Sequence, residues 1–95
     1  MFNVFCSSFD LDTQSTISYN QNITIYGMDT IHIDGTINEG ESPYEYESHM
    51  LLIVSSHTMY LNGDVVSISN SILGNQLTII GRKQIDISGI VMNLY

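Results

Sequence analysis

The 95-residue sequence contains no alanine, and only 13% of its residues are charged, about half of the usual share. Alanine is the residue that most favours α-helices, whereas the Ile, Val, Thr and Tyr that are abundant here favour β-strands. Arg82 and Lys83 are the only basic residues against ten acidic ones, so the formal net charge is −8. Binding to nucleic acid or to an anionic membrane needs clusters of Lys and Arg. We therefore expect an all-β protein that binds neither of them directly.

Cysteine and long apolar runs are also scarce. Cys6 is the only cysteine, which excludes an intramolecular disulfide and a zinc site built from cysteines of one chain. The longest apolar run, residues 50–54, is far shorter than the roughly 18 residues of a membrane-spanning helix. The first residues lack the basic segment and the long apolar segment of a signal peptide. We expect one all-β domain over residues 1–95 in the cytoplasm.

The motifs that usually mark an active site are missing from the sequence. It has no G-x-S-x-G, no glycine-rich phosphate loop that ends in lysine and no H-E-x-x-H. His32, His49 and His57 do not have the spacing of metal ligands, and His32 alternates with two isoleucines, so its side chain should face solvent. We expect a protein that is not an enzyme, with no catalytic residues, no metal and no cofactor.

Residues 22–37 and 76–91 repeat each other at an offset of 54, with six identical residues in sixteen positions. Each segment has two short runs in which apolar residues alternate, and each run is followed by a glycine. A weaker copy covers residues 58–73, in which Gly63 takes the place of Gly27 and Gly81. The separations between these glycines predict a repeating unit of about 18 residues.

One copy of this repeat buries its apolar side chains only by stacking on its neighbours. In a short β-solenoid of about five coils, Ile25, Leu61 and Ile79 form one interior column, and Ile33 and Ile87 belong to another. In the alternative, an antiparallel β-sandwich or barrel, each copy is a hairpin that turns at its glycine. The period-two alternation fits both architectures, and the constant spacing favours the solenoid.

The recurring patterns L-x-I-x-G and I-x-I-x-G between Gly63 and Val91 resemble those of bactofilins, which are cytoskeletal β-solenoid proteins with coils of similar length. The resemblance covers residues 22–37 and 58–91. It implies a compact triangular solenoid that polymerises end to end.

An acidic segment, residues 38–48, interrupts the repeat and contains all four glutamates. Proline is poorly tolerated in central strands, so Pro43 predicts a projecting loop, after which a strand over residues 50–55 rejoins the sheet. Carboxylates and tyrosines suit contact with a basic protein surface; a loop that only keeps the chain in solution is the alternative. The candidate partner-binding residues are Glu39, Glu41, Tyr44, Glu45, Tyr46 and Glu47.

Two classes of function fit these features. The first is a non-enzymatic structural or interaction module that self-associates into a homo-oligomer, because unpaired strands at the ends of a solenoid promote association. The second is a small acidic inhibitor of the phage type, which binds a nucleic-acid-handling or defence protein; a virion spike component is a further alternative. Mimicry of phosphates needs acids gathered on one face, and only Asp29 and Asp64 are expected near the same corner.

Overall fold

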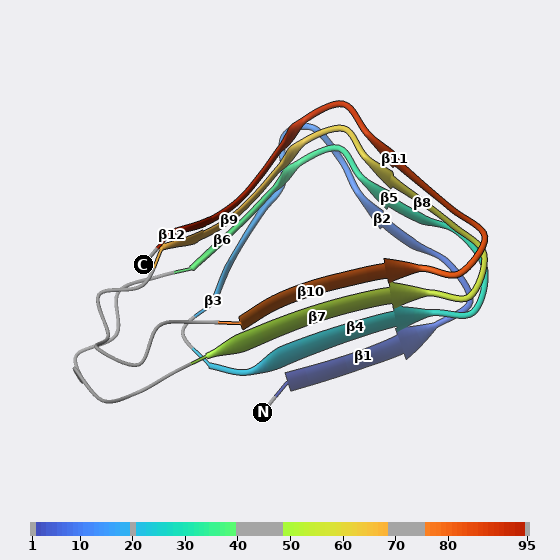
Figure 1. Cartoon of the computed structure of the whole chain (residues 1–95), viewed down its shortest axis with the longest axis horizontal. Coiled ribbons are helices and arrows are strands. Elements are labelled where there is room, and N and C mark those ends of the chain that lie inside the picture. Colours follow the sequence, from blue (N-terminus) through green and yellow to red (C-terminus); the bar gives the residue numbers. More distant parts are fainter. Residues whose placement is uncertain (1, 20, 40–48, 69–75, 95) are drawn as a thin grey trace.

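The computed structural model describes residues 2–19, 21–39, 49–68 and 76–94, and all regular structure in these residues is β-strand. The strands follow one another in four groups of three, which we call coils 1 to 4 (Figure 1). Coil 1 contains β1 (Phe2–Cys6), β2 (Phe9–Leu11) and β3 (Thr16–Tyr19), and coil 2 contains β4 (Ile23–Gly27), β5 (Ile31–Ile33) and β6 (Thr36–Glu39). Coil 3 contains β7 (Met50–Ser55), β8 (Thr58–Leu61) and β9 (Asp64–Ile68), and coil 4 contains β10 (Gln76–Gly81), β11 (Gln84–Ile87) and β12 (Ile90–Leu94).

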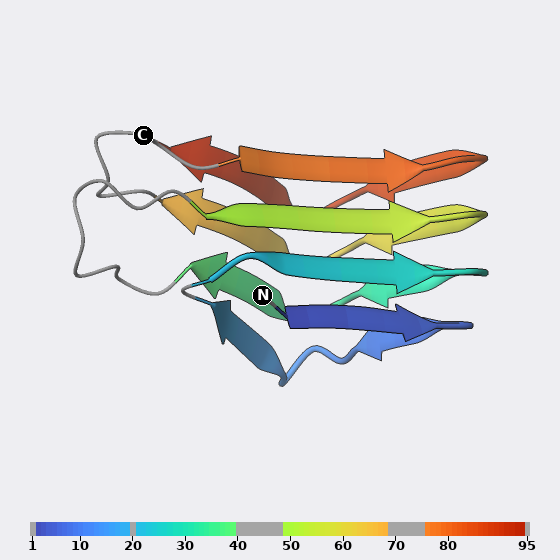
Figure 2. The same ribbon diagram turned by 90° about the horizontal axis from the view of Figure 1, so that it is seen from below.

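The coils stack so that equivalent strands form three parallel sheets of four strands each. Their orders are β1-β4-β7-β10, β2-β5-β8-β11 and β3-β6-β9-β12. The three sheets form the sides of a triangle (Figure 1), and the coils lie one above another when the molecule is turned by 90° (Figure 2). A sandwich of hairpins would pair neighbouring strands in antiparallel fashion, whereas every strand pair here is parallel. The prediction of an all-β solenoid is confirmed.

The spacing of the coils differs from the predicted period. Ile25 pairs with Ile53, and Ile53 pairs with Ile79, so a step from one coil to the next covers about half of the offset of 54 that relates the two best copies. That offset therefore spans two coils instead of three periods, and the described residues form four coils instead of five. Gly63 directly precedes β9 and so corresponds to Gly35, which precedes β6. Equating it with Gly27 and Gly81 was wrong, because the sequence contains glycines at two different corners.

Inward side chains of successive coils form continuous columns that fill the triangle. Ile53, and not Leu61, lies between Ile25 and Ile79 in the first column, whereas Leu61 lies between Ile33 and Ile87 in the column predicted for those two residues. Burying one such aliphatic side chain contributes about 1.5–3 kcal/mol, so these columns dominate the stability of the fold. The fully buried apolar side chains are Ile25, Ile31, Ile33, Ile37, Leu51, Ile53, Met59, Leu61 and Val65.

Close stacking leaves no room for a side chain at one corner of the triangle. A Cβ atom at Gly63 would overlap the carbonyl oxygen of Gly35 in the coil below, and a Cβ atom at Gly89 would overlap the carbonyl oxygen of Gly63. Glycine is required at this corner because the backbones approach each other directly. The spacing of the coils thus depends on a glycine in each coil that is added to the stack.

We predict that Gly63→Ala lowers the free energy of unfolding by at least about 2 kcal/mol, because the backbone has to move away from the Gly35 carbonyl oxygen. Thr13→Ala is the control at an exposed turn position, where the expected change is about 0.5 kcal/mol or less. Urea denaturation of both variants checks this. Equal stability of Gly63→Ala and the unmodified chain would contradict the close approach of the two coils.

Candidate functional site

The acidic segment predicted to bind a partner lies mostly outside the described residues, which include its Asn38 and Glu39 but not Glu41, Tyr44, Glu45, Tyr46 or Glu47. Asn38 and Glu39 are the last residues of β6, so the segment begins as a strand and not as a loop. The strand predicted at residues 50–55 is confirmed as β7.

The described aspartates lie in different parts of the triangle. Asp29 is at the corner between β4 and β5, whereas Asp64 begins β9 at the next corner, so the expectation that they share one corner was wrong. Asp10 and Asp86 lie in one outward column, separated by His32 and Tyr60. This scatter does not produce one acidic face among the described residues.

His32 lies in this outward column, and its side chain is 42% exposed, as the alternation of β5 predicted. Its Nδ1 atom lies 3.2 Å from Oδ1 of Asp10. On its other side the imidazole stacks on Tyr60, with ring centroids 4.7 Å apart and an interplanar angle of 12°. The column therefore holds ordered polar and aromatic contacts on the outer surface of the solenoid.

Apolar exposure is concentrated in coil 4, the last described coil of the stack. Among the side chains that the structure describes, five of the seven large apolar ones that are exposed belong to coil 4, with exposed fractions from 37% to 55%: Ile80, Ile85, Ile87, Ile90 and Val91. Ile87 continues the inward column of Ile33 and Leu61, yet it is 55% exposed where those two are 0% exposed. The difference arises because a coil covers each of the lower two and no described strand covers Ile87.

The opposite end of the stack covers its apolar side chains better. In coil 1, Leu11 and Tyr19 are 8% and 3% exposed. Phe9 and Ile17 pack against the core, as Leu77 and Ile79 of coil 4 also do. Among the residues of coil 1 whose side chains are described, Phe5 is the one exposed large apolar residue, and it contacts Tyr26 with ring centroids 6.2 Å apart. The two ends of the solenoid therefore differ in the apolar surface that they present.

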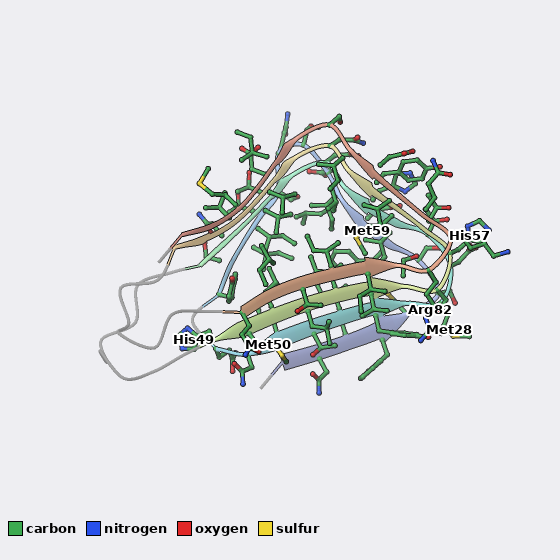
Figure 3. The ribbon with its side chains drawn as sticks, viewed as in Figure 1. Met28, His49, Met50, His57, Met59 and Arg82 are labelled. Carbon is green, nitrogen blue, oxygen red and sulfur yellow. The ribbon has the colours of Figure 1, made fainter. Side chains whose placement is uncertain are left out.

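Coil 4 also differs from the other coils in charge. Arg82 and Lys83, the only two basic residues of the chain, lie at the corner between β10 and β11, and β11 contains Asp86. Figure 3 places Arg82 at this corner, away from the interior to which Met59 points. Coil 4 is thus an apolar surface with charges of both signs, in a protein that is otherwise acidic.

The edges of the three sheets make coil 4 a surface for adding strands. β10, β11 and β12 are each the outermost strand of their sheet. Parallel strands use only half of their N–H and C=O groups toward one neighbour, and the other half point away from it. Apolar side chains together with three strand edges form the candidate functional site, which we call the coil 4 surface. It comprises β10 to β12 with the inward-facing Ile85, Ile87 and Val91 and the outward-facing Ile80 and Ile90.

The sequence predicted association through the unpaired strands at the ends of a solenoid, but it did not indicate which apolar residues are exposed there. Ile85 and Ile87 repeat the pattern of Ile31 and Ile33, which are fully buried. Identical patterns therefore indicated identical burial, although the two pairs occupy different levels of the stack. The two isoleucine pairs differ only in whether their coil lies inside the stack or at its end, and the alternation of apolar residues does not show where in the stack a coil lies.

The described part of the chain offers little for other kinds of site. It contains no group of three or more His, Cys, Asp or Glu residues placed to hold a metal ion. No helix in these ranges has the length and the apolar character needed to cross a membrane.

Comparison with known proteins does not assign the chain to a family. No protein-family model matches the sequence, and searches of curated proteins and of solved structures find no match either. The resemblance to bactofilins thus stays a prediction from the sequence, and the coil 4 surface is interpreted from its own chemistry.

One pH-dependent feature lies at the opposite end, in the turn after β2. Oδ1 of Asp12 accepts hydrogen bonds from the Ser15 hydroxyl at 2.8 Å and from the Gln14 N–H at 3.0 Å. These bonds, the Ser15 hydroxyl first, hold the pKa of Asp12 below its ordinary value of 3.8. A carboxylate with a depressed pKa stabilises the folded state above the unfolded pKa, and the contribution is lost as the pH falls through the folded pKa.

We therefore predict that Asp12→Ala lowers the melting temperature at pH 6 and that this difference shrinks as the pH falls below about 3.8. Melting curves by circular dichroism between pH 2.5 and pH 7 measure the effect. Ser15→Ala, which removes the first donor, should reduce the same difference. A penalty for Asp12→Ala that is constant across this range would rule out a role for the ionised carboxylate.

Proposed function

We propose that the chain is a non-enzymatic structural or interaction module that self-associates into a homo-oligomer through the coil 4 surface. The observation that carries this proposal is the exposure of Ile85 and Ile87 in columns whose members in coils 2 and 3 are completely buried. Placing a second polypeptide on coil 4 would continue these columns and restore the burial found inside the molecule. Burial of each half-exposed isoleucine contributes about 1 kcal/mol.

Hydrogen bonding supports the same interpretation. The outward N–H and C=O groups of three edge strands are arranged to pair with further strands, which is the usual route by which open sheets associate. A partner with its own strand edges provides hydrogen-bond partners for these N–H and C=O groups. A second copy of this chain has such edges at both of its ends. A second copy is therefore a complementary partner for the first.

Net charge opposes this association and makes it sensitive to salt. Each copy carries a formal charge of −8, so two copies repel each other at long range. Salt at about 0.15 M reduces the screening length to about 8 Å. Self-association is accordingly expected to be weaker at low ionic strength than at physiological ionic strength.

The acidic-inhibitor alternative gains no support from the described residues, because their aspartates are spread over different sheets and corners. The segment with most of the glutamates lies outside those residues. A virion spike component would also use stacked parallel coils, but no specific feature of this chain favours it over the self-associating module.

We predict that light scattering at about 100 μM protein and 0.15 M salt gives a mass above the monomer mass of 10.6 kDa, and that the mass falls when the salt is reduced to about 0.01 M. Ile87→Asp should give a monomer at both salt concentrations, because it buries a carboxylate in the interface. Phe5→Asp, at an exposed residue of coil 1, is the matched control and should associate as the unmodified chain does. A monomeric mass for the unmodified chain under all these conditions would refute the proposed function.

A further inference from the structure

The two ends of the solenoid differ in shape as well as in apolar exposure. Between the second and third strands of a coil, coil 1 has four residues, 12–15, whereas coils 2, 3 and 4 have two: 34–35, 62–63 and 88–89. The longer corner is held in a turn by the hydrogen bonds of Asp12 and by a bond from the Ser15 N–H to the Asp12 carbonyl oxygen, 3.1 Å long. In Figure 2 the connection from β2 to β3 reaches beyond these strands at the open side of coil 1.

Every coil that stacks on an earlier one within the chain brings a glycine to this corner. Gly35 approaches the carbonyl oxygens of Asp12 and Ser15, Gly63 approaches that of Gly35, and Gly89 approaches that of Gly63. A coil that stacks on coil 4 in the same register meets the backbone of residues 88–89 and needs a glycine there too. The corner of coil 1 has no glycine and two additional residues, so it obstructs a head-to-tail joint between copies.

Charge opposes the same joint at a second place. Asp10 and Asp86 occupy the same outward column within the chain. If coil 1 of one copy continued the stack on coil 4 of another, these two carboxylates would become neighbours on adjacent strands, which is unfavourable. Sterics and charge thus both oppose the use of coil 1 as the partner of coil 4.

We propose that the coil 4 surfaces of two copies pack against each other, tail to tail, in a closed dimer with twofold symmetry. This inference rests on the proposed function and names its partner, which is the same surface of a second copy. A contact that uses one patch on both molecules is closed by a twofold axis and does not grow into a filament. The dimer thus differs from the end-to-end polymer that the resemblance to bactofilins implies.

The composition of the coil 4 surface suits a contact with itself. Its inward-facing residues Ile85, Ile87 and Val91 are buried on both sides of the joint at once, and its edge strands pair in antiparallel fashion, as a twofold axis requires. Arg82 and Lys83 provide cations and Asp86 a carboxylate on the same coil. Each copy therefore brings both positive and negative side chains to this end. The described residues of coils 1 to 3 contain no Arg or Lys.

The single cysteine allows a direct distance test. Cys6 lies at the end of β1 in coil 1, so a nitroxide spin label on it marks the far end of each copy. In a tail-to-tail dimer, two such labels are separated along the stack by seven coil spacings of about 4.8 Å, or about 34 Å or more. In a head-to-tail dimer, the separation is four spacings, or about 19 Å.

Pulsed electron paramagnetic resonance on the labelled full chain measures this distance. Because a label on the half-buried Cys6 can disturb β1, the measurement is repeated with a label at Asn3→Cys, an exposed position, in a Cys6→Ser background. The longer of the two separations, with a mass of two chains, supports the tail-to-tail dimer. The shorter separation, or masses that grow with concentration beyond two chains, overturns the inference and leaves self-association standing. A monomer overturns both.

A second experiment tests the obstruction itself. Deletion of Thr13 and Gln14 together with Ser15→Gly converts the corner of coil 1 into an Asp-Gly pair like Asp34-Gly35, and Asp10→Asn removes the like charge. The altered chain should form assemblies larger than a dimer by light scattering, because both of its ends then accept another coil. Assemblies that stay at two chains, with the fold intact by circular dichroism, would show that the corner of coil 1 is not what limits growth.

Discussion

Parallel stacking of equivalent strands is the constraint on which the rest of the structure depends. Each coil places its inward side chains directly on those of the coil below, so Ile25, Ile53 and Ile79 share a column, as do Ile33, Leu61 and Ile87. Backbone contact at the corner of Gly35, Gly63 and Gly89 keeps the coils close enough for these columns to pack. A coil is stabilised by its neighbours, and among the described coils only coils 1 and 4 have a neighbour on one side and none on the other.

The two ends of the stack are built in different ways. Coil 1 covers its own interior with Leu11 and Tyr19 and extends a longer, hydrogen-bonded corner at residues 12–15. Coil 4 keeps the regular short corner and leaves Ile87 more than half exposed. A terminal coil that differs from the repeat protects an end, whereas one that follows the repeat offers the same surface that the interior coils use for packing. The proposed self-association through coil 4 rests on this asymmetry.

The sequence predicts the strands and the columns but not the period or the exposed end. Alternation at Ile31 and Ile33 identifies inward positions because a strand has only two faces. The predicted period was wrong for two reasons. Glycines mark two kinds of corner, and the segments that join one coil to the next differ in length. Strand pairing reveals both features, and composition reveals neither. The exposure of Ile85 and Ile87 was not predicted, although association through a solenoid end was, because the same I-x-I pattern is core in coil 2 and surface in coil 4. The acidic segment was selected for its charge, and most of it lies outside the described residues.

The central claim is that coil 4 is covered by a second copy, and hydrogen exchange of its backbone amides tests this most directly. Exchange measured by mass spectrometry at about 1 μM and at about 200 μM separates the free chain from the associated one. Amides in β10, β11 and β12 should exchange more slowly at the higher concentration, while those in β1, β2 and β3 should not change. Equal exchange in coil 4 at both concentrations, or new protection confined to coil 1, would contradict this claim.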